Sequence, residues 1–265
     1  MAGGALTRAR RVESMVIDEI GGKEMVTVSW FSAGVSSAVA TKLLISEIER
    51  IIYTHIDDQH PDTLRFVRDC EEWFGKPVEI LQSPLKSVEG AIMATAKYPS
   101  GVYVNGPRGA SCTRYLKRQV RQQWEYENAG PFRYVWGLDY DERHRAERIM
   151  ENQSDHDHAF PLIDRRLSKE HAHEILKASG IRRPAMYELG YHNNNCVGCV
   201  KGGMGYWNKI RKDFPEVFAA RAKMERIAGA TCINGVFLDE LEPGRGRHEP
   251  TIVGDCGILC EVMSL

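Results

Sequence analysis

The alternation of β-branched runs with helical patterns restricts the fold of this chain more than any other feature. Four short apolar runs have strand character, and the segments between them carry apolar residues at helical spacing. The expected strands are residues 25–31, 51–57, 77–81 and 133–138. Strands that alternate with helices are typical of a parallel sheet covered on both faces. The sequence therefore predicts an α/β protein with a doubly wound, mostly parallel sheet.

The helical segments outline the rest of the chain. Residues 61–75 begin with proline and end with glycine, the usual order for a helix. Beyond about residue 160 the strand signal fades, and helical patterns remain at 168–179 and 205–227. We expect an N-terminal extension, an α/β domain, and a helical, cysteine-rich C-terminal region packed on it. These three parts are residues 1–22, 23–160 and 161–265.

Composition excludes several classes of protein. Of the 265 residues, 43% are hydrophobic and 27% are charged, which is ordinary for a soluble globular protein. No apolar run approaches the roughly 20 residues of a membrane span, and no signal peptide is visible, so we expect a cytoplasmic protein. The net charge of -1 gives no overall attraction to nucleic acid. Seven cysteines, an odd number without an export signal, favour metal or redox chemistry over a disulfide framework.

A loop of small residues, in "FSAGVSSAVATKLL" (31–44), separates the first strand from its helix. In an open parallel sheet this turn is the usual phosphate site. Gly34 can adopt a positive φ, and the following helix directs free N–H groups at the loop. Ser32, Ser36 and Ser37 add hydroxyl donors. Neither the Walker nor the Rossmann glycine pattern is present, so an ordinary serine-capped helix start is the alternative.

A C-x-x-C pair, Cys196 and Cys199, lies among asparagines and glycines in "NNNCVGCVKGG". This spacing lets two thiolates face one metal centre from a tight turn. Two more ligands are then needed, and Cys112 and either Cys256 or Cys260 can supply them. A zinc ion and a 4Fe-4S cluster both accept four thiolates, and the spacing does not separate them.

The remaining cysteines have a simpler interpretation. An isolated cysteine is usually a buried small apolar residue. We assign that role to Cys70, which lies on the apolar side of a helical pattern. Cys232, in "GATCINGVF", is a weaker, spare ligand.

Two groups of cations are candidates for anion binding. Arg143, Arg145 and Arg148 offer planar guanidinium forks suited to phosphate or sulfate, or else form a solvated helix face. A denser basic segment, residues 108–121, can hold a nucleotide phosphate, follow a polynucleotide backbone, or be a plain exposed helix face. Its cations are Arg108, Arg114, Lys117, Arg118 and Arg121.

Five segments, in this order, resemble the phosphoadenosine phosphosulfate (PAPS) reductase family of the PP-loop, adenine nucleotide alpha hydrolase-like superfamily. "FSAGVSSAVATKLL" is similar to its S-G-G-K-D-S loop, and "THIDDQHPDTLRFVRDCEEWFG" to its second strand and following helix. "WGLDYDERHRAERI" resembles its G-x-R-x-x-E-S-x-x-R segment, "FPLID" its F-P-L-x-D/W element, and "YELGYHNNNCVGCVKGG" its G-Y-x-x-x-G-C-x-x-C stretch. The likeness spans about residues 25–202. "CTRYLK" resembles a C-x-x-x-L-K segment that supplies a cluster cysteine, and "DCGILC" resembles the E-C-G-I/L-H tail that carries a catalytic cysteine.

The resemblance implies a role for each candidate residue. The 23–160 domain would bind an adenine nucleotide, PAPS or ATP, with Asp57 near the adenosine. A backbone approach at Gly137 would accommodate the nucleotide, and Cys256 would attack the sulfur. The residues implied to hold phosphate or sulfate oxygens are Ser32, Gly34, Ser36, Ser37, Arg143 and Arg145. Those implied to hold a 4Fe-4S cluster, with zinc as the alternative, are Cys112, Cys196, Cys199 and Cys260.

Departures from the family pattern leave three functions open. Ser36 stands where ATP-using members have aspartate, Ala33 replaces a glycine, and Leu259 replaces the tail histidine. The first hypothesis is a PAPS reductase-like enzyme of sulfur metabolism, served by a thioredoxin-like reductant and able to form a homodimer. The second is an ATP-dependent iron–sulfur enzyme that thiolates tRNA or DNA. The third is a non-catalytic nucleotide-binding module.

Overall fold

A five-stranded, all-parallel sheet forms the centre of the computed structural model, which describes residues 24–106, 109–128 and 130–247. The strands are β1 (Val26–Trp30), β2 (Arg50–His55), β3 (Val78–Gln82), β6 (Phe132–Val135) and β7 (Asp157–Ala159). They lie in the order β3-β2-β1-β6-β7, with Ser29 of β1 paired to Ile51 on one side and Val135 on the other. The predicted doubly wound parallel architecture is confirmed at this level.

One strand of the main sheet and one small hairpin escape the sequence prediction because they are short. β7 has three residues, and the polar Asp157 and His158 give it no apolar run. A two-residue antiparallel hairpin, β4 (Asn105–Gly106) and β5 (Gly109–Ala110), lies apart from the main sheet. Neither is long enough for side-chain periodicity to identify it.

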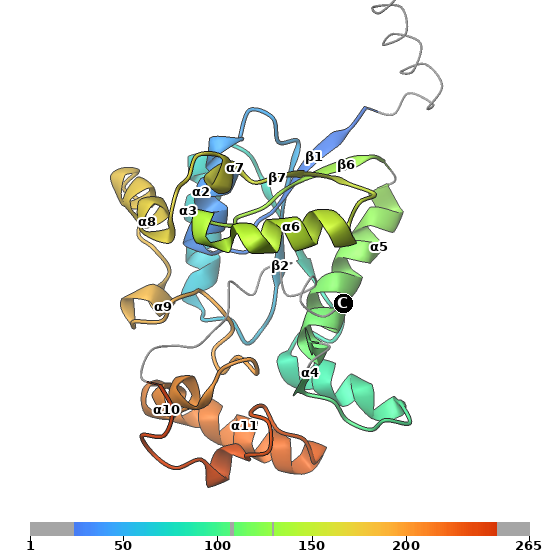
Figure 1. Ribbon diagram of the computed structural model, residues 1–265, viewed down its shortest axis with the longest axis vertical. Helices are drawn as coiled ribbons and strands as arrows, with labels where there is room; N and C mark the ends of the chain where they lie inside the picture. The colour runs from blue at the N-terminus through green and yellow to red at the C-terminus, as the bar shows by residue number, and fades with distance from the viewer. Residues whose placement is uncertain (1–23, 107–108, 129, 248–265) are drawn as a thin grey trace, which may run out of the picture.

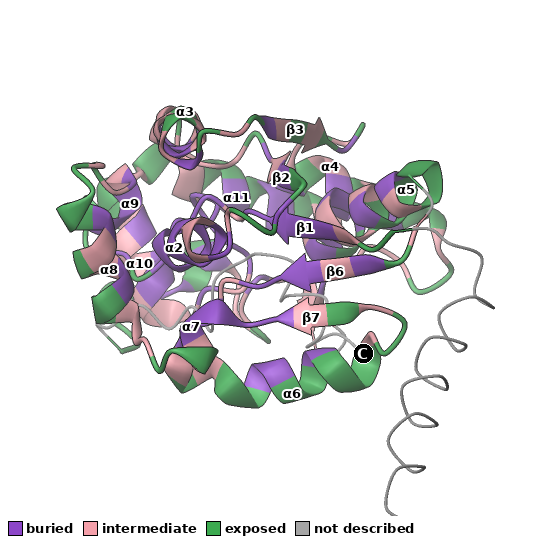
Figure 2. Ribbon diagram, turned by 90° about the horizontal axis from the view of Figure 1, so that it is seen from above, coloured by how far each residue is buried: buried purple, intermediate pink, exposed green. Residues whose placement is uncertain are grey.

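Helices cover both faces of the sheet (Figure 2). One face carries α2 (Val35–Leu43), α3 (Asp62–Phe74), α7 (Pro161–Asp164) and α8 (Lys169–Ala178). The other carries α5 (Gln119–Asn128) and α6 (Arg143–Asn152), the latter preceded by a 3-10 turn, Tyr140–Glu142. Residues on both sides of the expected seam near residue 160 share the core around α2.

A third apolar cluster lies beyond the sheet and contains most of the described cysteines. It is built by α4 (Val88–Met93), a 3-10 turn (Ala94–Lys97), a π-helical stretch (Thr113–Arg118), α9 (Ala185–Glu188), α10 (Met204–Asp213), α11 (Pro215–Ala228) and a 3-10 turn (Leu238–Glu240). In Figure 1, α10 and α11 lie at the bottom of the view, away from the sheet. None of the described helices is long and apolar enough to cross a bilayer.

Proline and glycine residues mark the helix boundaries as the sequence predicts, with one correction. As predicted, α3 begins after Pro61 and ends at Gly75, whose φ of 68° lets its N–H reach the carbonyls of Glu71 and Glu72. The prediction of one helical segment over 205–227 is wrong, because the helix is interrupted at Phe214, between α10 and α11. Pro215 has no N–H to continue α10 and instead occupies the first turn of α11.

Candidate functional site

The loop after β1 lies where the sheet order reverses. Chain connections run from β1 to β2 on one side and from β6 to β7 on the other, so the carboxyl ends of β1 and β6 form the switch point of the sheet. Here the prediction for Gly34 is wrong: Ala33 has the positive φ, 59°, whereas Gly34 is extended at -96°. A left-handed alanine costs about 1–2 kcal/mol. The buried amide of Asn194 stabilises it by donating to the Ala33 carbonyl at 2.8 Å.

Three predicted phosphate ligands meet at the start of α2. Ser32 Oγ donates to Ser37 Oγ at 2.8 Å, and Ser37 Oγ donates to the Gly34 carbonyl at 2.9 Å. The first intrahelical bond joins Ala38 N–H to the Gly34 carbonyl, so the N–H groups of Ser36 and Ser37 have no intrahelical acceptor. The N–H of Val35 donates to the Tyr187 hydroxyl at 3.3 Å. The loop thus presents the backbone N–H groups of Ser36 and Ser37 at one helix N-terminus, as an anion requires, while the Ser32 and Ser37 hydroxyls donate within the loop.

A small pocket opens beside Ser32 at the carboxyl ends of β1 and β2. Thr54 and Gln59 contribute polar groups to its wall, and Lys117 contributes a cation from the basic segment. The complete lining is Trp30, Phe31, Ser32, Ile52, Thr54, Gln59 and Lys117. The pocket therefore combines an apolar floor with hydroxyl, amide and ammonium groups.

Gly137 and Asp57 lie at the ends of their strands, as predicted. A Cβ on Gly137 would stand 2.4 Å from the Cα of Ser37, so this glycine allows the loop after β6 to touch the start of α2. The predicted approach of Gly137 to a nucleotide stays a prediction. Asp57 is half-exposed and accepts from Gln82 Nε2 at 2.6 Å. It lies on the β3 side of the edge.

The arginines after β6 divide into exposed and buried members. Arg143 and Arg148 are exposed, and Arg143 stacks over the Tyr140 ring at 5.1 Å. Arg145 is buried and forms an ion pair with Glu142. Beside them, burial raises the pKa of Asp139 to about 6, and the Glu142 carboxylate adds to the rise. Anion binding by Arg143 and Arg145 remains a prediction.

The basic segment does not present one continuous face within its described residues. Lys117 lines the pocket next to Ser32, whereas Arg114 is exposed and stacks over the rings of Tyr98 and Tyr115. Arg121 is buried and donates to Glu125 and Gln153. Arg108 lies outside the described residues. The segment is therefore better placed to meet a nucleotide in the pocket than to follow a polynucleotide.

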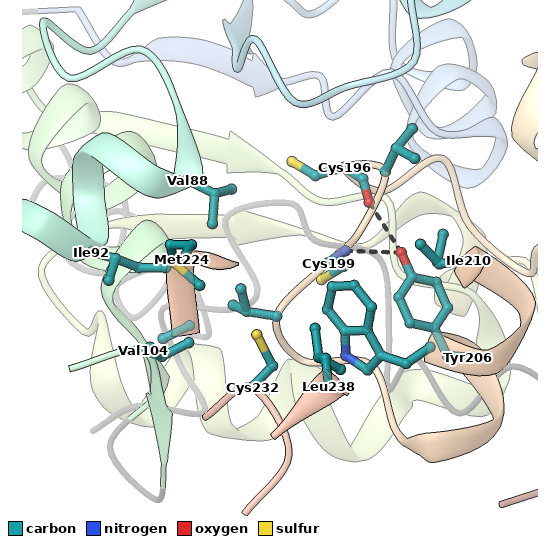
Figure 3. Close-up of a cluster of buried hydrophobic side chains, with 14 of the residues drawn as sticks. Val88, Ile92, Val104, Cys196, Cys199, Tyr206, Ile210, Met224, Cys232 and Leu238 are labelled. Carbon is teal, nitrogen blue, oxygen red and sulfur yellow. Dashed lines mark hydrogen bonds between the residues drawn. The ribbon is translucent and has the colours of Figure 1, made fainter. Parts of the chain in front are cut away.

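Cys196 and Cys199 lie on a tight turn held by Tyr206. The Cys199 N–H donates to the Tyr206 hydroxyl at 2.8 Å, and that hydroxyl donates to the Cys196 carbonyl at 3.3 Å (Figure 3). Gly198 takes the left-handed conformation that the turn needs, with a φ of 73°. The predicted tight turn is confirmed, and both cysteines are buried.

Two further cysteines lie in the same apolar cluster. Cys232 is buried in it, and Cys112 packs against it. We call the four cysteines at positions 112, 196, 199 and 232 the cysteine core. Cys70 lies instead in the core on the α2 face of the sheet, as expected of a small apolar residue. The predicted nucleophile Cys256 and ligand Cys260 lie outside the described residues.

The cysteine core is not a preformed site for a single ion. Within the described residues, no three Cys, His, Asp or Glu side chains form a group that could hold a metal ion. Four thiolates on one zinc, with Zn–S of about 2.3 Å, stand only about 3.8 Å apart. An iron–sulfur cluster is larger, so its thiolates stand further apart.

Unpartnered donors next to the cysteine core fit a sulfur-rich group. Ser111 Oγ, Trp207 Nε1 and Arg221 Nε are buried and have no hydrogen-bond partner in the described chain. Comparable atoms, such as Trp30 Nε1 and Trp124 Nε1, occur in another core of the described chain, so these donors are available to a ligand but do not by themselves require one. Cluster sulfurs accept hydrogen bonds. The four thiols with these donors therefore fit a 4Fe-4S cluster in chemistry.

Backbone pairing joins the pocket to the cysteine core. Gln59 lines the pocket, and its backbone forms an antiparallel bridge with Cys196. Next to this bridge, the Val197 N–H donates to the Asp58 carbonyl at 2.8 Å. The Asp58 carboxylate pairs at 2.7 Å with Arg221, which is 6% exposed, and accepts from the Val88 N–H at 2.7 Å. We call the pocket and the loops after β1, β2 and β6 the nucleotide edge.

Sequence reasoning missed four residues that make this connection. Asn194 and Gln59 lie beside predicted site residues, and the asparagine run before Cys196 was a usable signal. Asp58 follows the predicted Asp57 directly. Arg221 carries no signal, because a charged residue in a helical pattern is normally exposed.

A scan of the chain against protein-family models and a search of curated protein sequences found no match. The likeness to the PAPS reductase family therefore remains an expectation from the motifs, and function is argued from the site.

Proposed function

We propose that this protein is a PAPS reductase-like enzyme of sulfur metabolism. It binds phosphoadenosine phosphosulfate or a related adenine nucleotide at the nucleotide edge and transfers or reduces its sulfur group. The observation that carries this proposal is the position of Gln59, which lines the pocket beside Ser32 and pairs through its backbone with Cys196. A nucleotide held there would lie next to the segment that carries Cys196 of the cysteine core.

The chain's own residues have distinct tasks in this proposal. Donors of the first turn of α2, with Ser32 and Ser37, hold phosphate or sulfate oxygens, and Lys117 neutralises their charge. Ser36 leaves the helix N-terminus without a carboxylate, which suits an anion held there without a bridging metal ion. A 4Fe-4S cluster at the cysteine core would supply one-electron chemistry and a compact charged centre beside the pocket.

The proposed sulfur step is a nucleophilic substitution by a cysteine thiolate, assigned from the sequence to Cys256. The thiolate attacks the sulfate sulfur, the bond from sulfur to the bridging phosphate oxygen breaks, and the nucleotide leaves with that electron pair. The enzyme then carries a thiosulfonate. One thiol of a thioredoxin-like dithiol attacks its cysteine sulfur and releases sulfite, and the second thiol restores the enzyme as the reductant becomes a disulfide.

Titration of the anaerobically purified full chain tests the proposal. We expect phosphoadenosine phosphosulfate to bind more tightly than ATP by calorimetry, and a dithiol reductant to release sulfite from it. Cleavage of ATP to pyrophosphate would instead support the nucleic-acid thiolation enzyme. Nucleotide binding without turnover would support the non-catalytic module.

A matched pair of variants locates the binding site. Ser36→Asp places a carboxylate at the start of α2, where it repels an anionic nucleotide, so we expect at least about tenfold weaker binding. Ser46→Asp adds the same charge at an exposed position beyond α2 and should leave affinity unchanged. Equal affinities of the two variants would place the nucleotide elsewhere.

A further inference from the structure

We infer that Cys232 is the fourth ligand of the cluster, in the place that the family resemblance gave to Cys260. This inference rests on the proposed function, because it requires a cluster at Cys112, Cys196 and Cys199. It names a different residue to complete the set from the one that the family resemblance implies.

Cys232 shares one apolar cluster with the other three cysteines. Cys196, Cys199 and Cys232 are 7%, 4% and 5% exposed and lie in this cluster (Figure 3). Cys112 packs against it. Cys232 is close enough to Cys112 for their thiols to interact electrostatically, and Arg221 interacts in the same way with Cys232 and Cys196. Three segments distant in sequence thus contribute cysteines to one apolar cluster.

The turn that carries Cys232 is held by a buried carboxylate. α11 ends at Gly229, whose φ of 64° reverses the chain toward the cluster. Glu225 is fully buried and accepts from the Cys232 N–H and, at 2.7 Å, from the Leu238 N–H. Burying a carboxylate is costly unless it is well hydrogen-bonded. This fixed backbone holds the cysteine in one position, as a ligand requires.

Unpartnered donors separate a ligand from a plain core cysteine. Without a ligand in this part of the fold, Ser111 Oγ, Trp207 Nε1 and Arg221 Nε stay unsatisfied, at about 1–3 kcal/mol each, and Arg221 interacts electrostatically with Cys232. Thiolates and sulfides of a cluster supply acceptors for them. Since a four-iron cluster takes four thiolates, ligation by Cys232 also leaves both tail cysteines, Cys256 and Cys260, available for thiol chemistry.

Iron and acid-labile sulfide, measured per chain in anaerobically purified full-length variants, test this assignment. We expect Cys232→Ser to lose at least half of the iron of the wild type, together with its visible absorption. Cys260→Ser and Cys256→Ser should retain wild-type iron. Cys70→Ser is the matched control for substitution of a buried cysteine outside the cysteine core.

The outcomes separate this inference from the proposed function. Wild-type iron in Cys232→Ser, with a loss in Cys260→Ser, would overturn the inference and leave the cluster intact. A wild-type chain without iron would overturn the cluster itself. Circular dichroism checks the fold of each variant. Should Cys232→Ser not fold, Cys232→Ala, which keeps a small apolar side chain, gives the same comparison, and wild-type iron in it would also overturn the assignment.

Discussion

The nucleotide edge and the cysteine core are built by different forces, although they share a boundary. Within the nucleotide edge, the start of α2 is organised by hydrogen bonds between residues close in sequence, namely Ser32, Gly34 and Ser37. The cysteine core is organised by apolar packing of residues as far apart as Cys112 and Cys232. A short motif can therefore reveal the first region. The second becomes visible only after the chain has folded.

Contacts between the two regions are few but buried. Asn194 bonds to the loop after β1, the Gln59 backbone pairs with Cys196, and Arg221 pairs with Asp58. In each of these contacts, one residue is close in sequence to a cysteine or to a residue that lines the pocket. Perturbing these contacts should show how far each region depends on the other.

Removing the charge of Arg221 should produce the largest effect. Arg221→Met leaves Asp58 as an unpaired, largely buried carboxylate, and we expect a loss of about 3–5 kcal/mol in the free energy of unfolding, measured in urea. Arg226→Met on the same helix removes a half-exposed cation, whose surface ion pairs are screened by water, and should have a much smaller effect. If the two variants lost equal free energy of unfolding, the Arg221–Asp58 ion pair would not be a structural link between the two regions.

Acidification should stabilise the nucleotide edge through Asp139. Its pKa is about 6 in the folded chain against a usual 3.8, so between about pH 4 and pH 6 the native state holds a proton that the unfolded state has lost. The free energy of unfolding therefore falls as pH rises through this window, by up to about 3 kcal/mol. Asp139→Asn, which retains a good helix cap, should remove this dependence. Urea midpoints across the window check it, and a variant that kept the wild-type slope would contradict the assignment.

Crowding at Gly137 should act on the nucleotide edge alone. Gly137→Ala forces a Cβ against the Ser37 backbone, and we expect a cost of about 2 kcal/mol together with weaker nucleotide binding. Gly130→Ala meets only the Phe132 ring at 3.8 Å and serves as the control. Unchanged iron content in Gly137→Ala would separate the two regions, whereas a parallel loss of iron would show that they are coupled.

Loss of the Asn194 amide should have the smallest effect on stability. Asn194→Ala leaves the buried Ala33 carbonyl without its donor, at about 1–2 kcal/mol, and relaxes the loop that carries Ser32. Asn152→Ala, at an exposed position on α6, should be neutral. Calorimetric titration should then show weaker nucleotide binding only in Asn194→Ala. Wild-type affinity there would mean that the left-handed Ala33 is held by its other neighbours.

The sequence by itself determined the parallel α/β architecture, because strand and helix periodicities and the Pro61 and Gly75 signals are local properties of the chain. It located the loop after β1 and the C-x-x-C turn for the same reason. The left-handed Ala33 was missed because Asn194, distant in sequence, holds it. β7 was missed because it is short and polar, and the break at Phe214 was a local proline signal that the helical pattern masked.

Only the tertiary structure decided which cysteines meet. Spacing along the chain ranked Cys232 as a spare ligand, but the reversal after α11 and the buried Glu225 bring it into the cysteine core. The fold likewise buried Arg121, Arg145 and Arg221, which the sequence presents as ordinary surface cations. Long-range packing and the pairing of buried charges depend on contacts between distant residues, and no local pattern in the sequence encodes them.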